Sequence, residues 1–352
     1  MVVVHDAWVE RVETLARRCM SARDTASLAQ LTPEIRAVVA AMIDADAGAG
    51  VVSRTLAALN DALTVRIIAL TVAHHRLPPT AWCWLALGSE GRGEQTFVTD
   101  QDNGIIFSAA DHTEARALRP LLLACAGEVN SVLAECGIPL CDGGIMAGNA
   151  ACCLSLDEWC ERFVSWVRTP EPQALLDATI FFDFRALYGD ARLAHALREH
   201  LLRITAGADV FLRMLAENAL AAEPPLGLVR DFAARDGVVD LKKYGSRIFV
   251  DAARILGLTS ADPGTVARLR QAAASGSLSP SDAEAAIGAF QHLQRIRLLG
   301  QQRVLASGAG VAPTNLIAPQ ALNAFDRHVL LESFKQARLL QQRLKTTFCI
   351  EG

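Results

Sequence analysis

One segment, residues 85–107, constrains the fold more than any other part of the chain. It passes from an apolar stretch through a Gly-Ser dipeptide to an Asp-x-Asp pair, which precedes the apolar run 105–107. The pair consists of Asp100 and Asp102, and side chains two residues apart point to the same face of an extended strand. The spacing therefore predicts two carboxylates on one face, at the start of a buried strand.

This pattern suits the binding of a metal ion and phosphate. Mg²⁺ takes one or two carboxylates from a protein and keeps its other positions for water and substrate phosphates. Gly88 and Ser89 follow an expected strand over 82–87, and a glycine there lets the backbone turn sharply with its N–H groups directed at phosphate oxygens. Taken alone, Asp100 and Asp102 could equally form a polar turn before a strand.

The composition is that of a globular chain. Its 352 residues are 51% hydrophobic and 20% charged, and this length suits about two or three domains. The net charge of −4 disfavours a nucleic-acid partner, because no strongly basic face is expected. We expect no signal peptide and no membrane-spanning helix, and hence a cytoplasmic protein. The nine cysteines form no zinc-binding pattern and are expected to be reduced and buried.

The apolar pattern divides the chain into three expected regions. Residues 1–76 form an N-terminal helical arm, residues 77–200 combine strands and helices, and residues 201–352 form a helical domain. The expected elements of the middle region are strands at 82–87, 102–107 and 138–146 and a helix at 113–135. From about residue 157 the pattern is almost wholly helical, and it ends in one long helix within 319–348. The predicted fold class is therefore α+β with a mixed sheet.

Several stretches of the chain resemble one family. Residues 88–95, Gly-Ser-Glu-Gly-Arg-Gly-Glu-Gln, and 99–103, Thr-Asp-Gln-Asp-Asn, look like the nucleotidyltransferase domain found in bacterial signal-transduction proteins. That domain is related to protein-PII uridylyltransferase and glutamine synthetase adenylyltransferase. The likeness continues at 137–147 and 181–190, and stretches at 240–245 and 295–301 are similar to the family's C-terminal substrate-binding domain.

The resemblance implies a polymerase-β-like core between the N-terminal arm and a C-terminal helical bundle. It also implies an enzyme in which Asp100 and Asp102 hold Mg²⁺ or Mn²⁺ and UMP or AMP passes from a nucleoside triphosphate to an acceptor. The expected acceptor is a regulatory protein. The alternatives are a catalytically weak module that senses a nucleotide and a transferase that acts on a small molecule.

A third carboxylate usually completes such a site, and the sequence offers two. Asp142 lies on the next expected strand, in a Cys-Asp-Gly-Gly setting that could also be a turn. Asp183 lies between aromatic residues and could instead pair with Arg185 within a helix. We place Asp142 in the catalytic set and keep Asp183 as the alternative.

The Gly-Ser loop offers further candidates for nucleotide binding besides Gly88 and Ser89. Arg92 could bind phosphate through both arms of its planar guanidinium, or form an ion pair with Glu90 or Glu94. Glu94 and Gln95 could hold the loop in place or line the pocket for the base and ribose.

Two other groups of residues stand apart from this loop. Lys242 and Lys243 form a basic pair that is usually a solvated face, and the resemblance implies that they reach the triphosphate or the acceptor. His74 and His75 are expected at a helix end, where a cationic imidazole suits the helix dipole, and we assign them no catalytic role.

Overall fold

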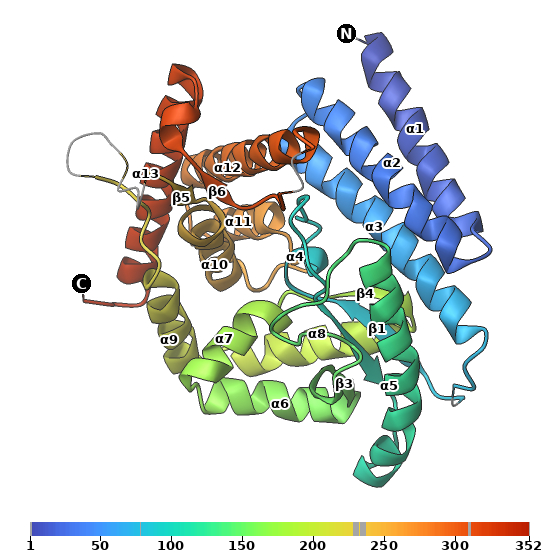
Figure 1. Cartoon of the computed structure of the whole chain (residues 1–352). Coiled ribbons are helices and arrows are strands. Elements are labelled where there is room, and N and C mark those ends of the chain that lie inside the picture. Colours follow the sequence, from blue (N-terminus) through green and yellow to red (C-terminus); the bar gives the residue numbers. More distant parts are fainter. Residues whose placement is uncertain (1, 78, 228–231, 233–236, 309–310, 352) are drawn as a thin grey trace. The chain divides into compact units, whose positions relative to one another are not determined.

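The computed structural model describes residues 2–77, 79–227, 232, 237–308 and 311–351. The chain forms two compact units, coloured along the sequence in Figure 1. The first comprises residues 1–47, 51–166 and 180–204, and the second comprises residues 48–50, 167–179 and 205–352.

A mixed four-stranded sheet lies in the first unit, in the order β3-β2-β1-β4. Strand β1 (Trp82–Ala86) pairs antiparallel with β2 (Asn103–Phe107) and with β4 (Arg185–Gly189), and β2 pairs parallel with β3 (Cys153–Ser155). The register sets Ala86 opposite Asn103, and one residue farther the Leu87 N–H donates to the Asp102 carbonyl at 2.9 Å. The two central strands therefore bring the Gly-Ser turn beside the Asp-x-Asp pair.

The two central strands are almost entirely buried, which explains their unbroken apolar runs. Helix α5 (His112–Glu135) follows β2, begins at the N-cap Asp111 and ends before Gly137, whose φ is +84°. Helix α6 (Leu156–Arg168) follows β3, and α8 (Ala191–Thr205) follows β4. Strands β1 and β2 and helix α5 agree with the sequence prediction to within one residue.

Aromatic side chains from α6 and the segment before β4 form one cluster against the sheet. Trp159, Phe163, Trp166, Phe181, Phe182 and Phe184 have ring centroids 5.0 to 6.4 Å apart in neighbouring pairs. The Trp159 indole N–H donates to the Ile105 carbonyl of β2 at 3.0 Å. Burial of this many rings provides much of the apolar stabilisation of the first unit.

Three helices precede the sheet: α1 (Val2–Ser21), α2 (Thr25–Asp44) and α3 (Ala49–Val72). The apolar stripe of α3, with Leu59, Leu63 and Ile67, is buried. On another side of α3, Asp61 accepts from the guanidinium of Arg185 on β4 at 2.7 Å. The N-terminal helices therefore belong to the same compact unit as the sheet.

Helices α3 and α5 are each long and apolar enough to cross a membrane, judged by length and composition alone. Both carry buried residues of the first unit, and α3 carries the Asp61 ion pair with the sheet. One or two helices of this length and composition are weak evidence for a membrane span, because buried core helices share both properties.

The sheet differs from the sequence prediction at two strands. The expected strand at 138–146 is an irregular loop, because a turn at Asp142-Gly143 and a positive φ at Gly144 interrupt it. The loop still meets the sheet edge twice, where Pro139 O accepts from Gln101 N and Ile145 O accepts from Asn103 N, at 3.0 and 3.1 Å. The third strand along the chain is instead the three-residue β3, and β4 lies in a stretch expected to be helical.

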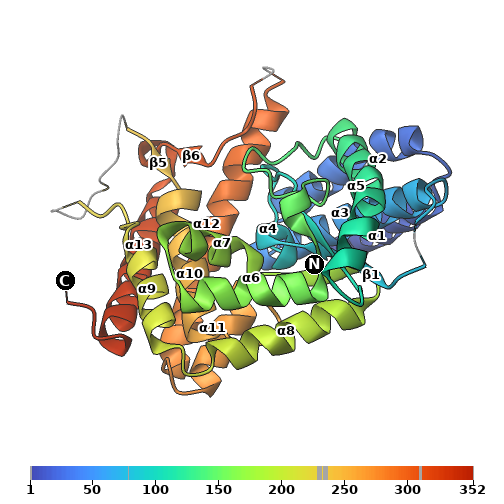
Figure 2. The same ribbon diagram turned by 90° about the horizontal axis from the view of Figure 1, so that it is seen from below.

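The second unit is mostly helical, as predicted. Its helices from residue 205 onward are α9 (Asp209–Leu220), α10 (Arg247–Leu256), α11 (Thr265–Ala274), α12 (Pro280–Ala306) and α13 (Ala324–Thr347). Most of α7 (Pro172–Phe181) also belongs to it. Figure 2 shows these helices from below, with the short antiparallel pair β5 (Val239–Asp240) and β6 (Leu316–Ile317) near α12 and α13. The long C-terminal helix begins at Ala324, five residues later than the expected start.

All nine cysteines are free thiols. Six are buried and two are half-buried, in line with the sequence prediction, whereas Cys349 is exposed after α13.

The aromatic cluster yields a prediction for stability. Phe163 is 1% exposed and Phe325 is 73% exposed. We expect Phe163→Ala to lower the free energy of unfolding by about 3–5 kcal/mol, because the ring leaves a cavity, and Phe325→Ala to change it by less than about 0.5 kcal/mol. Urea denaturation of both variants measures the difference, and equal midpoints would contradict the assignment of the cluster to the core.

Candidate functional site

The carboxylates of Asp100 and Asp102 converge with the Cys141 thiol. Their possible ligand atoms, one carboxylate oxygen from each aspartate and the sulfur, all lie within 4.8 Å of one another. Both aspartates and the cysteine are half-buried, so the group is open to solvent on one side. Burial is the main cause of the raised pKa of Cys141, and the negative charges of Asp102 and Asp100 add to it. The thiol is therefore neutral beside two carboxylates.

Gly88 packs directly beneath one of these carboxylates. It has a φ of +54°, and a β-carbon built on it would lie 3.0 Å from Oδ2 of Asp102. A side chain at this position would meet the carboxylate and strain the backbone, which explains the need for glycine. The short helix α4 (Gly88–Gly91) begins here, and Ser89 lies in its first turn.

Buried amide side chains fix the backbone around the two aspartates. The side-chain NH₂ of Gln101 donates to the carbonyls of Asn130 and Ile138, both at 2.9 Å. The side-chain NH₂ of Asn130 donates in turn to the side-chain oxygens of Gln101 and Asn103, at 2.8 and 3.0 Å. Because residues 101 and 103 point toward α5, the alternation of an extended chain directs residues 100 and 102 to the opposite face.

Arg92 lies in a network of ion pairs behind the Gly-Ser turn. Its Nε donates to Glu94 Oε2 at 2.8 Å and its Nη1 donates to Asp183 Oδ2 at 2.7 Å. Asp183 is fully buried, and Arg92 and Glu94 are 11% and 12% exposed. Gly91 lets the backbone at Asp183 pack against the loop, since a β-carbon at residue 91 would lie 2.1 Å from the Asp183 carbonyl oxygen.

Helix α3 supports the same loop from the other side. The side-chain NH₂ of Asn60 donates to the side-chain oxygen of Gln95 at 3.0 Å, and Gln95 donates to the Thr99 hydroxyl at 3.3 Å. Arg185 bridges Asp61 of α3 and the carbonyl of Glu90, with Nη2 at 2.7 and 3.1 Å. The loop from residue 88 to residue 99 is thereby tied to α3 and to β4.

Glu90 carries a buried carboxyl in this loop. Burial raises its pKa to about 8, the negative charges of Asp61 and Asp102 raise it further, and Arg185 and a hydrogen bond from the Asp102 backbone oppose the shift. The side chain is therefore mostly protonated at neutral pH and adds no charge beneath the two aspartates.

Two family models match the chain. The model described as "Putative nucleotidyltransferase DUF294" matches residues 33–173, and the model described as "Putative nucleotidyltransferase substrate binding domain" matches residues 209–348. Together they cover most of the sequence. The chain belongs to the DUF294 family. No curated protein matches the chain.

The DUF294 match spans the converging aspartates, and the description of the family suggests nucleotidyl transfer as the class of reaction. The geometry separates the predicted site residues into two sets. Gly88 lies beside Asp102 and Ser89 follows it in α4, whereas Arg92, Glu94 and Gln95 bond to other protein side chains. For Arg92, the ion pair with Glu94 is the alternative that the sequence left open.

The two candidate third carboxylates of this DUF294 chain differ in setting. Asp142 is exposed on the turn next to Cys141, and the group within 4.8 Å, among the described residues, contains Cys141 and not Asp142. Asp183 lies in the loop before β4 and pairs with Arg92, so the alternative of a pair with Arg185 within a helix is wrong. Asp183 is thus fully buried and paired, whereas Asp142 is exposed.

The second family match contains the predicted lysines. Lys242 and Lys243 are exposed in a π-helical turn at 242–246, and their N–H groups donate to the Asp240 carboxylate at 2.8 and 2.9 Å. They belong to the second unit, and their role in binding stays a prediction.

Sequence reasoning missed the amide residues that orient the DUF294 aspartates. Gln101, Asn103 and Asn130 are 0%, 1% and 4% exposed. The available signal was Asn130, a polar residue on the otherwise apolar face of α5 between Val129 and Leu133. A buried amide in such a position needs hydrogen-bond partners, and the loop at 101–103 supplies them.

The buried carboxyl of Glu90 predicts a pH dependence. In the unfolded chain the group should titrate near its usual 4.5, and in the folded protein near 8. The folded protein then holds an extra proton between these values, and the free energy of unfolding falls by up to about 1.4 kcal/mol per pH unit as pH rises through the window. We expect Glu90→Gln to remove this contribution. Urea denaturation between pH 5 and 8.5 measures it, and equal slopes in parent and variant would contradict it.

The Arg92 network predicts a loss of stability on a conservative change. One guanidinium bridges Glu94 and Asp183, and a lysine ammonium cannot reproduce this fork. We expect Arg92→Lys to lower the free energy of unfolding by about 1–3 kcal/mol. Thermal and urea denaturation test this. Unchanged stability together with weaker triphosphate binding would instead assign Arg92 to phosphate.

Proposed function

We propose that this chain is a Mg²⁺- or Mn²⁺-dependent nucleotidyltransferase that transfers UMP or AMP from a nucleoside triphosphate to a side-chain hydroxyl of a regulatory protein. The observation that carries the proposal is the convergence of Asp100 and Asp102 beside Gly88, whose positive φ and close contact with the Asp102 carboxylate disfavour a side chain at this turn.

The donor set fits a divalent cation. Two half-buried carboxylates with one open side match the way in which Mg²⁺ is held together with substrate phosphates. Asp100 and Asp102 would hold the ion. Once bound, such an ion neutralises negative charge that develops on the transferred phosphoryl group. The adjacent Cys141 sulfur is a softer ligand, which favours Mn²⁺ over Mg²⁺ if it takes part.

The chain's own groups would position the reactants. The N–H groups at Gly88 and Ser89 would meet phosphate oxygens at the start of α4, next to the two carboxylates. The acceptor oxygen would attack the α-phosphorus in line as the bond to the bridging oxygen breaks and pyrophosphate leaves. Asp142, exposed on the turn beside Cys141, is the proposed base for the acceptor's proton.

The proposed setting is the cytoplasm and the proposed acceptor is a protein. A net charge of −4 supports a protein rather than RNA, because RNA binding draws on clustered basic residues. Lys242 and Lys243 lie within the match to the substrate-binding domain, which supports a part for them in binding the triphosphate or the acceptor.

One observation favours a second candidate, a module that senses a nucleotide without chemistry. Among the described residues, the group around the Asp pair holds a thiol where a third carboxylate would help bind metal and accept a proton. Binding of a metal and a nucleotide needs only the two aspartates and the phosphate-binding turn. Transfer also needs a base, so Asp142 separates the two candidates.

A labelling experiment tests the proposal. The protein is incubated with Mg²⁺ or Mn²⁺ and an α-labelled nucleoside triphosphate in host lysate. We expect label on one discrete protein and release of pyrophosphate. Asp100→Asn and Asp102→Asn should each abolish both, because each removes a charge from the metal site and little volume.

Glu135→Gln is the matched control, since it makes the same chemical change at an exposed position of α5. It should retain full labelling. Asp142→Asn should keep triphosphate binding and slow transfer at least about tenfold if Asp142 is the base. Label on RNA would overturn the acceptor. Saturable triphosphate binding without label on any acceptor would favour the sensor, and labelling unchanged in both aspartate variants would overturn the site.

A further inference from the structure

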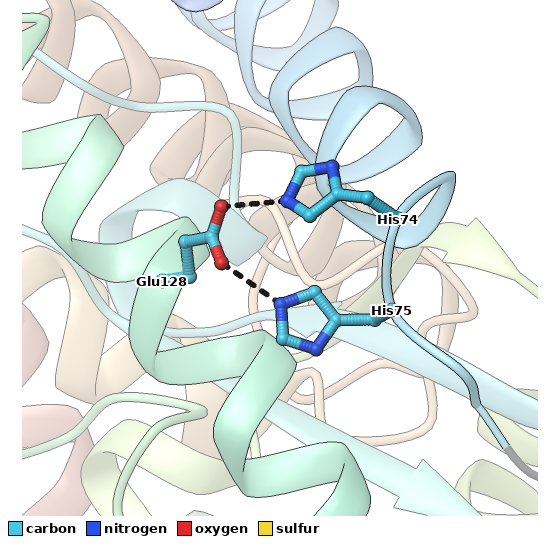
Figure 3. A group of neighbouring side chains, drawn as sticks. All are labelled: His74, His75 and Glu128. Atoms are coloured by element: carbon cyan, nitrogen blue, oxygen red, sulfur yellow. Dashed lines mark hydrogen bonds and ion pairs between the residues drawn. The ribbon is translucent and has the colours of Figure 1, made fainter.

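A second cluster of side chains that could hold a metal ion lies on the surface of the first unit and shares no residue with the aspartate group. Figure 3 shows the Glu128 carboxylate of α5 between the rings of His74 and His75. Nε2 of His74 lies 2.8 Å from one carboxylate oxygen, and Nε2 of His75 lies 2.8 Å from the other. The three possible ligand atoms all lie within 4.8 Å of one another.

The chain reaches this arrangement through an unusual helix end. Consecutive side chains on a helix point about 100° apart and do not face one target. Here the N–H groups of both His74 and His75 donate to the carbonyl of Thr71, at 3.2 and 3.3 Å, and the backbone leaves α3 in a turn. The two imidazoles lie with ring centroids 5.3 Å apart and tilted by 42°, so both present Nε2 to Glu128.

The donor set selects the class of ion. Two imidazole nitrogens and one carboxylate oxygen suit Zn²⁺ and its neighbours in the first transition series better than Mg²⁺, which prefers oxygen alone. Tetrahedral Zn²⁺ places its ligand atoms about 3.3 Å apart, so modest side-chain rotation would fit the cluster around an ion.

We propose that His74, His75 and Glu128 form a binding site for a divalent transition-metal ion, with Zn²⁺ as its expected occupant and water in the fourth position. The side chains of His74 and Glu128 are 60% and 42% exposed, which gives the ion an entry path, and His75 is 21% exposed and anchors the inner side. The site is independent of the nucleotidyl-transfer proposal.

Such an ion would link the end of α3 to the middle of α5. The same two helices contact the segment that carries the proposed site. Helix α3 bonds to Gln95 through Asn60 and to Arg185 through Asp61, and α5 bonds to Asn103 through Asn130. Metal binding would thus stabilise both supports of the loop at a point outside it.

The test is titration of the full chain with Zn²⁺ by calorimetry, paired with thermal unfolding. We expect one equivalent to bind at this site and to raise the melting temperature, because an ion that binds the folded state stabilises it. His74→Gln with His75→Gln, and separately Glu128→Gln, should weaken this binding at least about tenfold and abolish the thermal shift. All three positions are at least partly exposed, so the variants should fold.

His112→Gln is the matched control, because His112 forms an exposed pair with Glu161 in which one imidazole meets one carboxylate at 3.3 Å. It should leave Zn²⁺ binding unchanged. Substitution with Co²⁺ separates this site from Cys141, since thiolate ligation produces a charge-transfer band that nitrogen and oxygen ligands do not. Equal Zn²⁺ affinity in the parent and the histidine variants, or a bound ion that shows the thiolate band alone, would overturn the proposal.

Discussion

The orientation of residues 100–103 depends on one buried hydrogen-bond network. Asn130 uses its side-chain NH₂ for both Gln101 and Asn103, and its side-chain oxygen accepts from the Gly148 N–H at 2.9 Å. A single amide on α5 therefore holds the edge of β2 and the end of the 138–148 loop together. Buried polar groups of this kind are costly unless each has a partner, so the arrangement has few alternatives. Because this network turns Gln101 and Asn103 toward α5, the side chains of Asp100 and Asp102 point away from α5.

The other carboxylates around the Gly-Ser loop are paired or neutral, so they add little repulsion to the charges of Asp100 and Asp102. The carboxylates of Asp61, Glu94 and Asp183 each meet a guanidinium of Arg92 or Arg185. Burial keeps the carboxyl of Glu90 mostly neutral. The negative potential of the loop is thus concentrated on the half-buried pair, where a cation can reach it. A site organised before its ligand arrives loses less free energy in ordering its groups on binding.

The sequence predicted those features that depend on local patterns. The strands on either side of the Gly-Ser turn have continuous apolar runs, and the helix after β2 has a capped amphipathic pattern. The two-residue alternation of an extended chain predicted that the side chains of Asp100 and Asp102 lie on one face. Strand β3 has three residues and exists through parallel pairing with β2, which no local pattern reveals. The partner of Arg92 is 91 residues away in sequence, and the position of Cys141 depends on an irregular loop. Both are set by tertiary contacts that one sequence does not display.

The contribution of α3 to the loop bears on how the catalytic part of this chain can be isolated. The sheet and its connecting helices begin at residue 82, and a fragment started just before it would seem a natural choice for expression. Such a fragment would lack Asn60 and Asp61, so Gln95 and Arg185 would each lose a hydrogen-bond partner near the Gly-Ser turn. The smallest autonomous piece of this protein that retains a formed site must therefore include α3.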